Sequence, residues 1–215
     1  MFQKFDLGVF LLAVLPVLLA ITIREAARAY AARRYGDPTP EQFGRLTLNP
    51  LVHIDLFGTI IVPLLMFLFT PFVFGWAKPV PIDSRRFSHP RQAWRAISAV
   101  GPLANLSMAF VWGLGFVLAP HVGSFGEPLS QMSNYGVMIN AVLFVLNIIP
   151  ILPFDGGRFI DTFLPAKASM SFQKIEPYGS WIVLLLLITG VLGKFISPLV
   201  FAVMLAVQSL ANLLM

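Results

Sequence analysis

The sequence contains no cysteine, which excludes both a disulfide framework and a thiolate metal site. Charge is also scarce: only 12% of the 215 residues are Asp, Glu, Lys or Arg, against about 25% in a soluble domain. Hydrophobic residues make up 57% of the chain, and the mean hydropathy is +0.80. The net charge of +5 does not indicate nucleic-acid binding, because the basic residues flank the apolar runs. These features predict an all-α integral membrane protein whose partner is the lipid bilayer and not a nucleic acid.

Six uncharged stretches provide the candidate membrane segments. A helix crosses the ~30 Å hydrocarbon core in about 20 residues. No internal repeat or low-complexity linker divides the chain, so residues 1–215 are expected to form a single membrane-embedded domain. The uncharged stretches are residues 7–23, 56–77, 96–126, 128–154, 177–193 and 195–215, and the last two form the C-terminal helices.

The placement of basic residues predicts the topology. Of the fifteen Lys and Arg residues, five lie between residues 24 and 45 and five between 78 and 95, whereas none lies between 96 and 157. If residues 56–77 crossed the membrane fully, the two clusters would face opposite sides, against the positive-inside rule. Two prolines and two glycines in this stretch also favour a broken segment. We therefore expect a multi-pass protein of the cytoplasmic membrane, with about five full crossings plus one re-entrant or interfacial segment.

This topology has a consequence for two acidic residues. The first helix and the helix that precedes Asp155 would both run from outside to inside. Their ends would then lie at the same depth, so Glu25 and Asp155 can meet at the cytoplasmic end of the bundle. If residues 56–77 crossed fully, the two carboxylates would lie on opposite faces of the membrane.

The residues that end the first apolar helix, Arg24-Glu25-Ala26-Ala27-Arg28, have the spacing of H-E-x-x-H with both histidines replaced by arginine. In that motif the two histidines bind Zn²⁺ from one helix face, and the glutamate activates a metal-bound water. Arginine stays protonated, offers only hydrogen-bond donors and repels a cation. The pattern therefore indicates a protease-like helix that has lost its metal ligands.

Four further patches follow in a characteristic order. They are G-R-L-T-L-N-P at residues 44–50, G-W-A-K-P-V-P at 75–81, G-P-x-x-N at 101–105 and D-G-G at 155–157. Together with the arginine-substituted helix motif, they resemble the site-2 protease family of intramembrane zinc metalloproteases. The resemblance covers residues 7–161, and it implies a polytopic helical bundle of the site-2 protease type.

The resemblance also implies roles for individual positions. In that family the two histidines and the aspartate of D-G-G bind zinc, and the glutamate is the general base. Arg24 and Arg28 stand at the histidine positions, Glu25 at the base position and Asp155 at the third ligand position. Substrate-binding or site-supporting positions correspond to Asn105, Asn147, Gly101, Pro102, Gly156 and Gly157.

Each of these residues also has a purely structural interpretation. The two arginines could be snorkelling side chains at a helix end, and D-G-G could be a turn. Asn105 and Asn147 could join helices by hydrogen bonds, while Gly101-Pro102 could be a kink or a close helix contact. His53 is the histidine nearest the first helix; for it we expect a local hydrogen bond and not a ligand role.

The two arginines have a physical rationale as a pair. Without a metal, Glu25 and Asp155 would be unpaired carboxylates at membrane depth, which is costly. Two guanidinium groups carry the same +2 charge as zinc, and Arg24 and Arg28 lie one turn apart on one helix face. We therefore expect an internal ion-pair cluster with Asp155 in place of the metal.

The sequence thus favours a catalytically inactive, zinc-free pseudoprotease that binds transmembrane helices of a client or partner protein without cutting them. The alternative is an active intramembrane metalloprotease, with an unusual metal site or as a variant of an active parent. The family is one of zinc metalloendopeptidases, but no cofactor is expected in this chain because both histidine positions are arginine. A small transporter using buried charges is a third hypothesis, and the family-like patches disfavour it.

Overall fold

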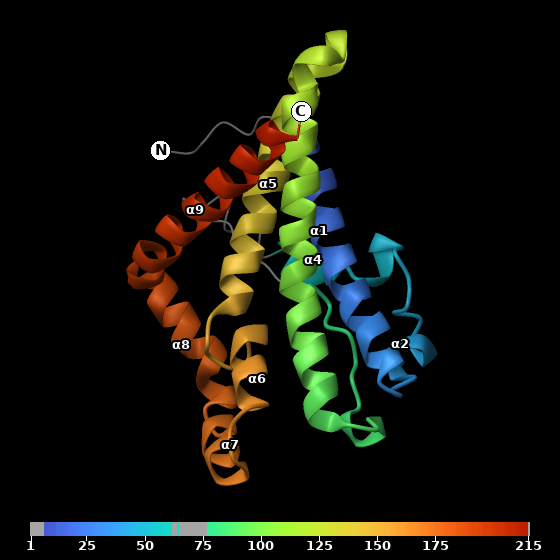
Figure 1. Ribbon diagram of the computed structural model, residues 1–215, viewed down its shortest axis with the longest axis vertical. Helices are drawn as coiled ribbons and strands as arrows, with labels where there is room; N and C mark the ends of the chain where they lie inside the picture. Colours follow the sequence, from blue (N-terminus) through green and yellow to red (C-terminus); the bar gives the residue numbers. More distant parts are fainter. Residues whose placement is uncertain (1–6, 62–63, 65–76, 215) are drawn as a thin grey trace.

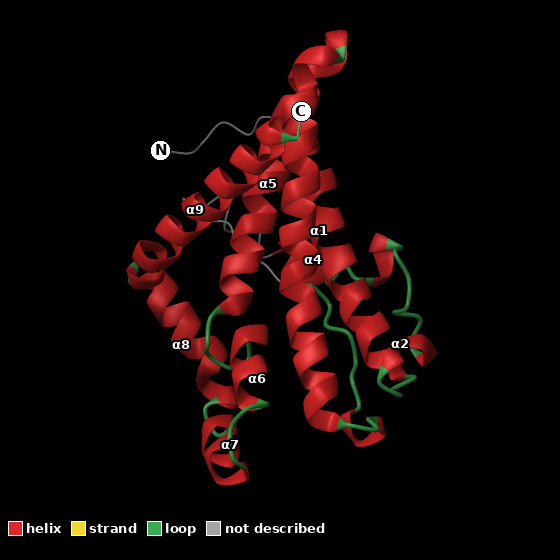
Figure 2. Cartoon of the chain, in the orientation of Figure 1, coloured by secondary structure: helices red, strands yellow, loops and turns green. Residues whose placement is uncertain are grey.

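The computed structural model describes residues 7–61, 64 and 77–214, and every regular element within these ranges is a helix (Figure 2). Three long helices, α1 (Leu7–Arg34), α4 (Pro90–Leu118) and α5 (Gly126–Ile148), pack side by side and form the core (Figure 1). Around them lie α2 (Thr39–Gln42), η1 (Pro50–Val52), η2 (Leu56–Ile61), η3 (Ser84–Arg86), η4 (Ala119–His121), η5 (Gly123–Phe125), α6 (Asp155–Asp161), α7 (Ala166–Gln173), α8 (Glu176–Ile188) and α9 (Val191–Leu213).

Small residues allow the core helices to approach closely. The buried face of α1 presents alanines to α4 and α5. A Cβ added to Gly136 of α5 would lie 2.2 Å from the ring of Trp112 on α4, so the indole fits only because that glycine has no side chain. A Cβ at Gly113 would meet Val207 of α9 at 2.8 Å. Small residues at such contacts are the usual basis of helix packing in membranes.

Two buried asparagines join the three core helices. The Asn105 amide of α4 donates to the carbonyl oxygen of Ala20 on α1 at 3.3 Å and to Oδ1 of Asn140 on α5 at 2.9 Å. The Asn140 amide in turn donates to the carbonyl oxygen of Gly136 at 2.9 Å. Asn105 therefore links the helices at Ala20, which lies one helical turn before Arg24 on α1.

The two basic clusters lie at the same end of the bundle. The end of α1 and the start of α4 meet at the bottom of Figure 1. There the Asp83 N–H donates to the Asp37 carboxylate at 2.8 Å, and the Ser88 N–H donates to the Tyr35 carbonyl at 3.3 Å. Beside these contacts, hydrogen bonds from Arg85 hold the pKa of the Asp83 carboxyl low, at about 2.

The stretch 56–77 falls largely outside the described residues, and its first six residues form η2. The two ends of the segment are well defined, because the Lys78 N–H donates to the His53 carbonyl oxygen at 3.0 Å. The backbone of Lys78 thus lies beside that of His53.

Within the described ranges, three helical segments are long and apolar enough to cross a membrane: Pro90–His121, Gly123–Ile148 and Val191–Leu213. The expected five crossings exceed this number. The sequence placed a helix boundary at Lys194, but the chain bends at Gly190, which has a φ of 71°. Lys194 therefore lies inside α9. With 13 residues, α8 is about 20 Å long at 1.5 Å per residue, too short to cross alone.

Candidate functional site: an ion-pair cluster at the metalloprotease motif

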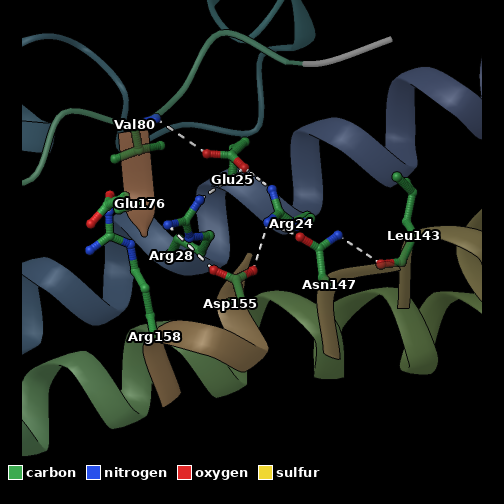
Figure 3. A network of polar contacts seen from close by, with 9 residues as sticks. All are labelled: Arg24, Glu25, Arg28, Val80, Leu143, Asn147, Asp155, Arg158 and Glu176. Atoms are coloured by element: carbon green, nitrogen blue, oxygen red, sulfur yellow. Dashed lines mark hydrogen bonds and ion pairs between the residues drawn. The ribbon is translucent and has the colours of Figure 1, made fainter. Parts of the chain in front are cut away.

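The arginine-substituted motif lies in the second half of α1, which continues to Arg34, and Figure 3 shows its side chains. Because Arg24 and Arg28 are four residues apart, their side chains leave the same face of the helix. This face is directed at α6, and the two side chains are only 15% and 14% exposed. They are therefore partly buried within the bundle and are not snorkelling side chains at its surface.

Asp155 is the first residue of α6, and its side chain is 2% exposed. The sequence placed residues 128–154 in one stretch, but α5 ends at Ile148, and the proline-containing residues 149–154 turn the chain into α6. A Cβ at Gly156 would lie 2.2 Å from the Ile148 carbonyl oxygen, and one at Gly157 would lie 2.4 Å from the Ile151 carbonyl carbon. The two glycines therefore allow α6 to fold back against this turn and to direct Asp155 at α1.

The guanidinium groups contact both carboxylates. Arg24 Nη2 donates to Asp155 Oδ2 at 2.6 Å and to Asn147 Oδ1 at 2.8 Å, and Arg24 Nη1 pairs with Glu25 Oε1. Arg28 lies 3.5 Å from Asp155 Oδ1 and donates to Glu25 Oε1 at 3.4 Å. Two positive and two negative charges are thus gathered in one cluster, and the expected pairing of the arginines with Asp155 is present (Figure 3).

The second oxygen of Glu25 is held by the backbone. Glu25 is buried, and its Oε2 accepts a hydrogen bond from the Val80 N–H at 3.2 Å. Val80 lies between Pro79 and Pro81, which have no N–H group. It therefore provides the single backbone donor of this tripeptide, and that donor points at Glu25. In the sequence, the patch at residues 75–81 contributed only to the family resemblance. The isolated N–H between two prolines is the feature from which this contact could have been predicted.

The supporting residues fall into two groups. Asn147 belongs to the cluster, because its amide donates to the Leu143 carbonyl at 2.7 Å while its oxygen accepts from Arg24. Gly101 also lies against it: a Cβ there would be 3.1 Å from Asp155 Oδ2 and 3.3 Å from Arg28 Cδ. Asn105 and the buried Pro102 make no ion-pair or hydrogen-bond contact with the cluster among the described residues.

His53 makes a hydrogen bond within its own loop. Its side chain is fully buried, and Nε2 lies 3.0 Å from the Thr47 carbonyl oxygen, within the G-R-L-T-L-N-P patch. The neighbouring Arg45 donates to the Val52 carbonyl. The histidine thus stabilises its own loop, as the sequence predicted.

The residues present do not fit a zinc ion. Arg24 and Arg28 have no lone pair to donate and fill the position at which a cation would sit. Both oxygens of Asp155 face guanidinium nitrogens. Across residues 7–61, 64 and 77–214, no three His, Asp or Glu side chains converge as a metal-binding group.

The chain has relatives among curated proteins. It is 35% identical over 200 residues to the "Putative zinc metalloprotease YwhC" of Bacillus subtilis, covering 91% of this chain and 88% of that protein. It is 28% identical over 198 residues to the "Putative zinc metalloprotease Rip2" of Mycolicibacterium smegmatis, covering 90% and 73%. No family model and no solved structure matches the chain.

The helical fold and the motif on α1 define a membrane protein of the metalloprotease type. At this identity and coverage, the chain belongs to the site-2 protease family.

Proposed function

We propose that this chain is a zinc-free pseudoprotease, which binds a transmembrane segment of a client or partner protein without cleaving it. The observation that carries the proposal is the ion pairing of Asp155 with Arg24 and Arg28. In a zinc protease the metal supplies a water with a pKa near 7 and polarises the carbonyl that is attacked. Guanidinium groups that already neutralise Asp155 and Glu25 do neither.

The cluster also explains how the scaffold can persist without a metal. Two buried carboxylates at a membrane boundary require compensating charge, and the two arginines supply +2. The Val80 N–H continues to hold Glu25, so the segment that lies over the site keeps its place. Loss of zinc is therefore compatible with a folded bundle that retains a surface for a transmembrane helix.

We further propose a multi-pass topology in which the cluster lies at the cytoplasmic end and residues 56–77 form a re-entrant or interfacial segment. Support comes from the shared end of the two basic clusters and from the hydrogen bond between Lys78 and His53. A segment whose two ends are hydrogen-bonded to each other leaves its flanks on one side of the membrane. The positive-inside rule then assigns that side to the cytoplasm.

One observation favours the alternative of an active protease. Glu25 is intact, buried and oriented by a backbone hydrogen bond, as a general base would need to be. An enzyme of this kind would require a metal site built from residues other than the two arginines.

Reversion of the two arginines tests the proposal. The variant R24H/R28H restores two histidines beside Asp155, the donor set of a three-ligand zinc site with an open position for water. The protein as it stands should bind a transmembrane segment in a crosslinking assay without cutting it, whereas R24H/R28H should bind zinc. Its matched control is R33H/R34H, which places two histidines on the exposed end of the same helix.

The outcomes separate the hypotheses. Cleavage by the unchanged chain, abolished by E25Q, would overturn the proposal and establish the active protease. Zinc binding by R24H/R28H and not by R33H/R34H would support the assignment of Arg24 and Arg28 to the zinc-ligand positions of the family. Failure of the unchanged chain to crosslink to any transmembrane segment would refute the binding role.

A further inference from the structure

A polar cavity lies at the basic end of the bundle and shares no residue with the ion-pair cluster. Its volume is about 340 Å³, and it is partly open to the surface. It is formed where the first turns of α4 approach α6, α7 and the start of α8. Its lining includes Arg91, Trp94, Arg158, Asp161, Gln173 and Glu176.

Two of the four charges in this cavity satisfy each other. Arg158 forms an ion pair with Glu176, and its guanidinium lies over the Trp94 ring, 4.9 Å from the ring centre. These contacts join α6 to α4 and α8 and leave no net charge.

The other two charges contact only neutral groups among the described residues. Arg91 Nη2 donates to the Leu164 carbonyl at 3.3 Å. Asp161 Oδ2 accepts from the Gln173 amide at 2.8 Å, while Asp161 Oδ1 is buried without a hydrogen-bond partner. An unpartnered carboxylate oxygen is costly. One cavity thus contains a cation and an anion that are not paired with each other.

The N-terminus of α4 adds to the positive potential near Arg91. The 29-residue helix α4 begins at Pro90 without a side-chain cap, and Pro90 and Arg91 both line the cavity. The positive end of the helix dipole and the guanidinium therefore favour an anion at the same place. The Asp161 carboxylate, in contrast, favours a positively charged group that can donate a hydrogen bond.

The charges around the cavity indicate which molecules can reach it. From Ala96 to Phe154 the sequence carries a single charge, Glu127, whereas Arg91 and Arg95 come just before this range and Arg158 just after it. Such a change marks the boundary between hydrocarbon and water, where lipid head groups lie.

We propose that this cavity binds a zwitterionic group in which a phosphate and a primary ammonium are joined by a short linker, as in phosphoethanolamine. The phosphate contacts Arg91 and the start of α4, and the ammonium contacts Asp161. A quaternary ammonium has no N–H to donate to the carboxylate. A purely anionic head group leaves Asp161 facing a like charge. The same chemistry occurs in a phosphatidylethanolamine lipid and in soluble glycerophosphoethanolamine.

Thermal unfolding of the full chain in detergent, followed by tryptophan fluorescence, tests the site. Short-chain phosphatidylethanolamine, phosphatidylcholine and phosphatidylglycerol are titrated separately, as is glycerophosphoethanolamine. We expect phosphatidylethanolamine to raise the midpoint saturably, with an apparent affinity at least about tenfold above that of phosphatidylcholine, because a hydrogen bond to a charged group is lost with choline. A response to glycerophosphoethanolamine as well would assign the site to the head group alone; a response to the lipid only would assign it to a membrane lipid.

Substitutions at the two unpaired charges make the test specific. The variant D161N should bind phosphatidylglycerol more tightly than phosphatidylethanolamine, because the cavity then carries an uncompensated positive charge. The variant R91Q should lose the response to both lipids. The control K167Q changes a charge on exposed α7 outside the cavity and should respond as the unchanged chain does. Equal responses to the three lipids, or unchanged preferences in D161N and R91Q, would overturn the proposal.

Discussion

A guanidinium nitrogen of Arg24 lies 2.6 Å from a carboxylate oxygen of Asp155, although the two residues are 131 positions apart in the chain. The sequence motifs predict a histidine ligand position of the site-2 protease family at the first residue and an aspartate ligand position at the second. The structure brings the two positions together, and the interaction between them is a direct ion pair. This pairing has measurable consequences.

Purified protein is expected to contain no stoichiometric zinc. Of the three ligand positions, only Asp155 can coordinate a metal, and a single carboxylate is too few. Elemental analysis of protein prepared without chelator measures this, with R24H/R28H as the positive comparison. About one tightly held zinc per chain, lost in D155N, would contradict the expectation.

Arg24, Arg28 and Asp155 should be energetically coupled. The variant D155N leaves two partly buried guanidinium groups with Glu25 as their one remaining carboxylate, which should cost on the order of 3–5 kcal/mol of unfolding free energy. The triple variant R24Q/R28Q/D155N should cost less than the sum of its parts, because it leaves one uncompensated charge, that of Glu25, whereas each of the three single changes also leaves one. Reversible unfolding in detergent, read as a multiple-mutant cycle, provides the measurement. Strict additivity would show that the three side chains do not interact.

Gly101 should not tolerate a methyl group. A Cβ there would lie 3.1 Å from Asp155 Oδ2 and 3.3 Å from Arg28 Cδ, so G101A should displace the ion pair and destabilise the protein by about 1–3 kcal/mol. Its matched control is G193A on α9, where nothing lies within 4 Å of the added carbon. That variant should be neutral or stabilising by up to about 1 kcal/mol. Equal effects of the two substitutions would mean that α4 does not press on the cluster.

Residues on either side of the 56–77 stretch should be accessible from the same face of the membrane. The chain has no cysteine, so single cysteines at Gln42, Ser84 and Ser124 can be labelled without background. We expect Q42C and S84C to react with an impermeant thiol reagent from the cytoplasmic side, and S124C, between the top ends of α4 and α5, to react from the other side. Labelling of Q42C and S84C from opposite faces would refute the proposed topology.

Much of the ion-pair cluster could be predicted from the sequence. The spacing of Arg24 and Arg28 fixed one helix face, and the charge distribution placed Asp155 at the same depth. Physical chemistry then required the charges to pair, since unpaired carboxylates are costly there. Asn147 joined the cluster because it lies at the end of the helix that leads to Asp155.

Other features depend on packing that one sequence does not reveal. The bend in the C-terminal region falls at Gly190 and not at Lys194, because a left-handed backbone conformation, and not a charge, ends α8. The start of α6 depends on the close contacts of Gly156 and Gly157 with the preceding turn. The pairing of Val80 with Glu25 joins segments 55 residues apart, and no periodicity in either segment indicates it.

The hydrogen bond between Lys78 and His53 gives the chain a modular property. Because the chain is hydrogen-bonded across residues 53 and 78, the bundle does not depend on the length of residues 54–77 to bring Val80 to Glu25. Mutations that lengthen, shorten or rewrite these residues can therefore accumulate while the contact between Val80 and Glu25 stays in register. In evolutionary terms, this stretch can diversify independently of the ion-pair cluster.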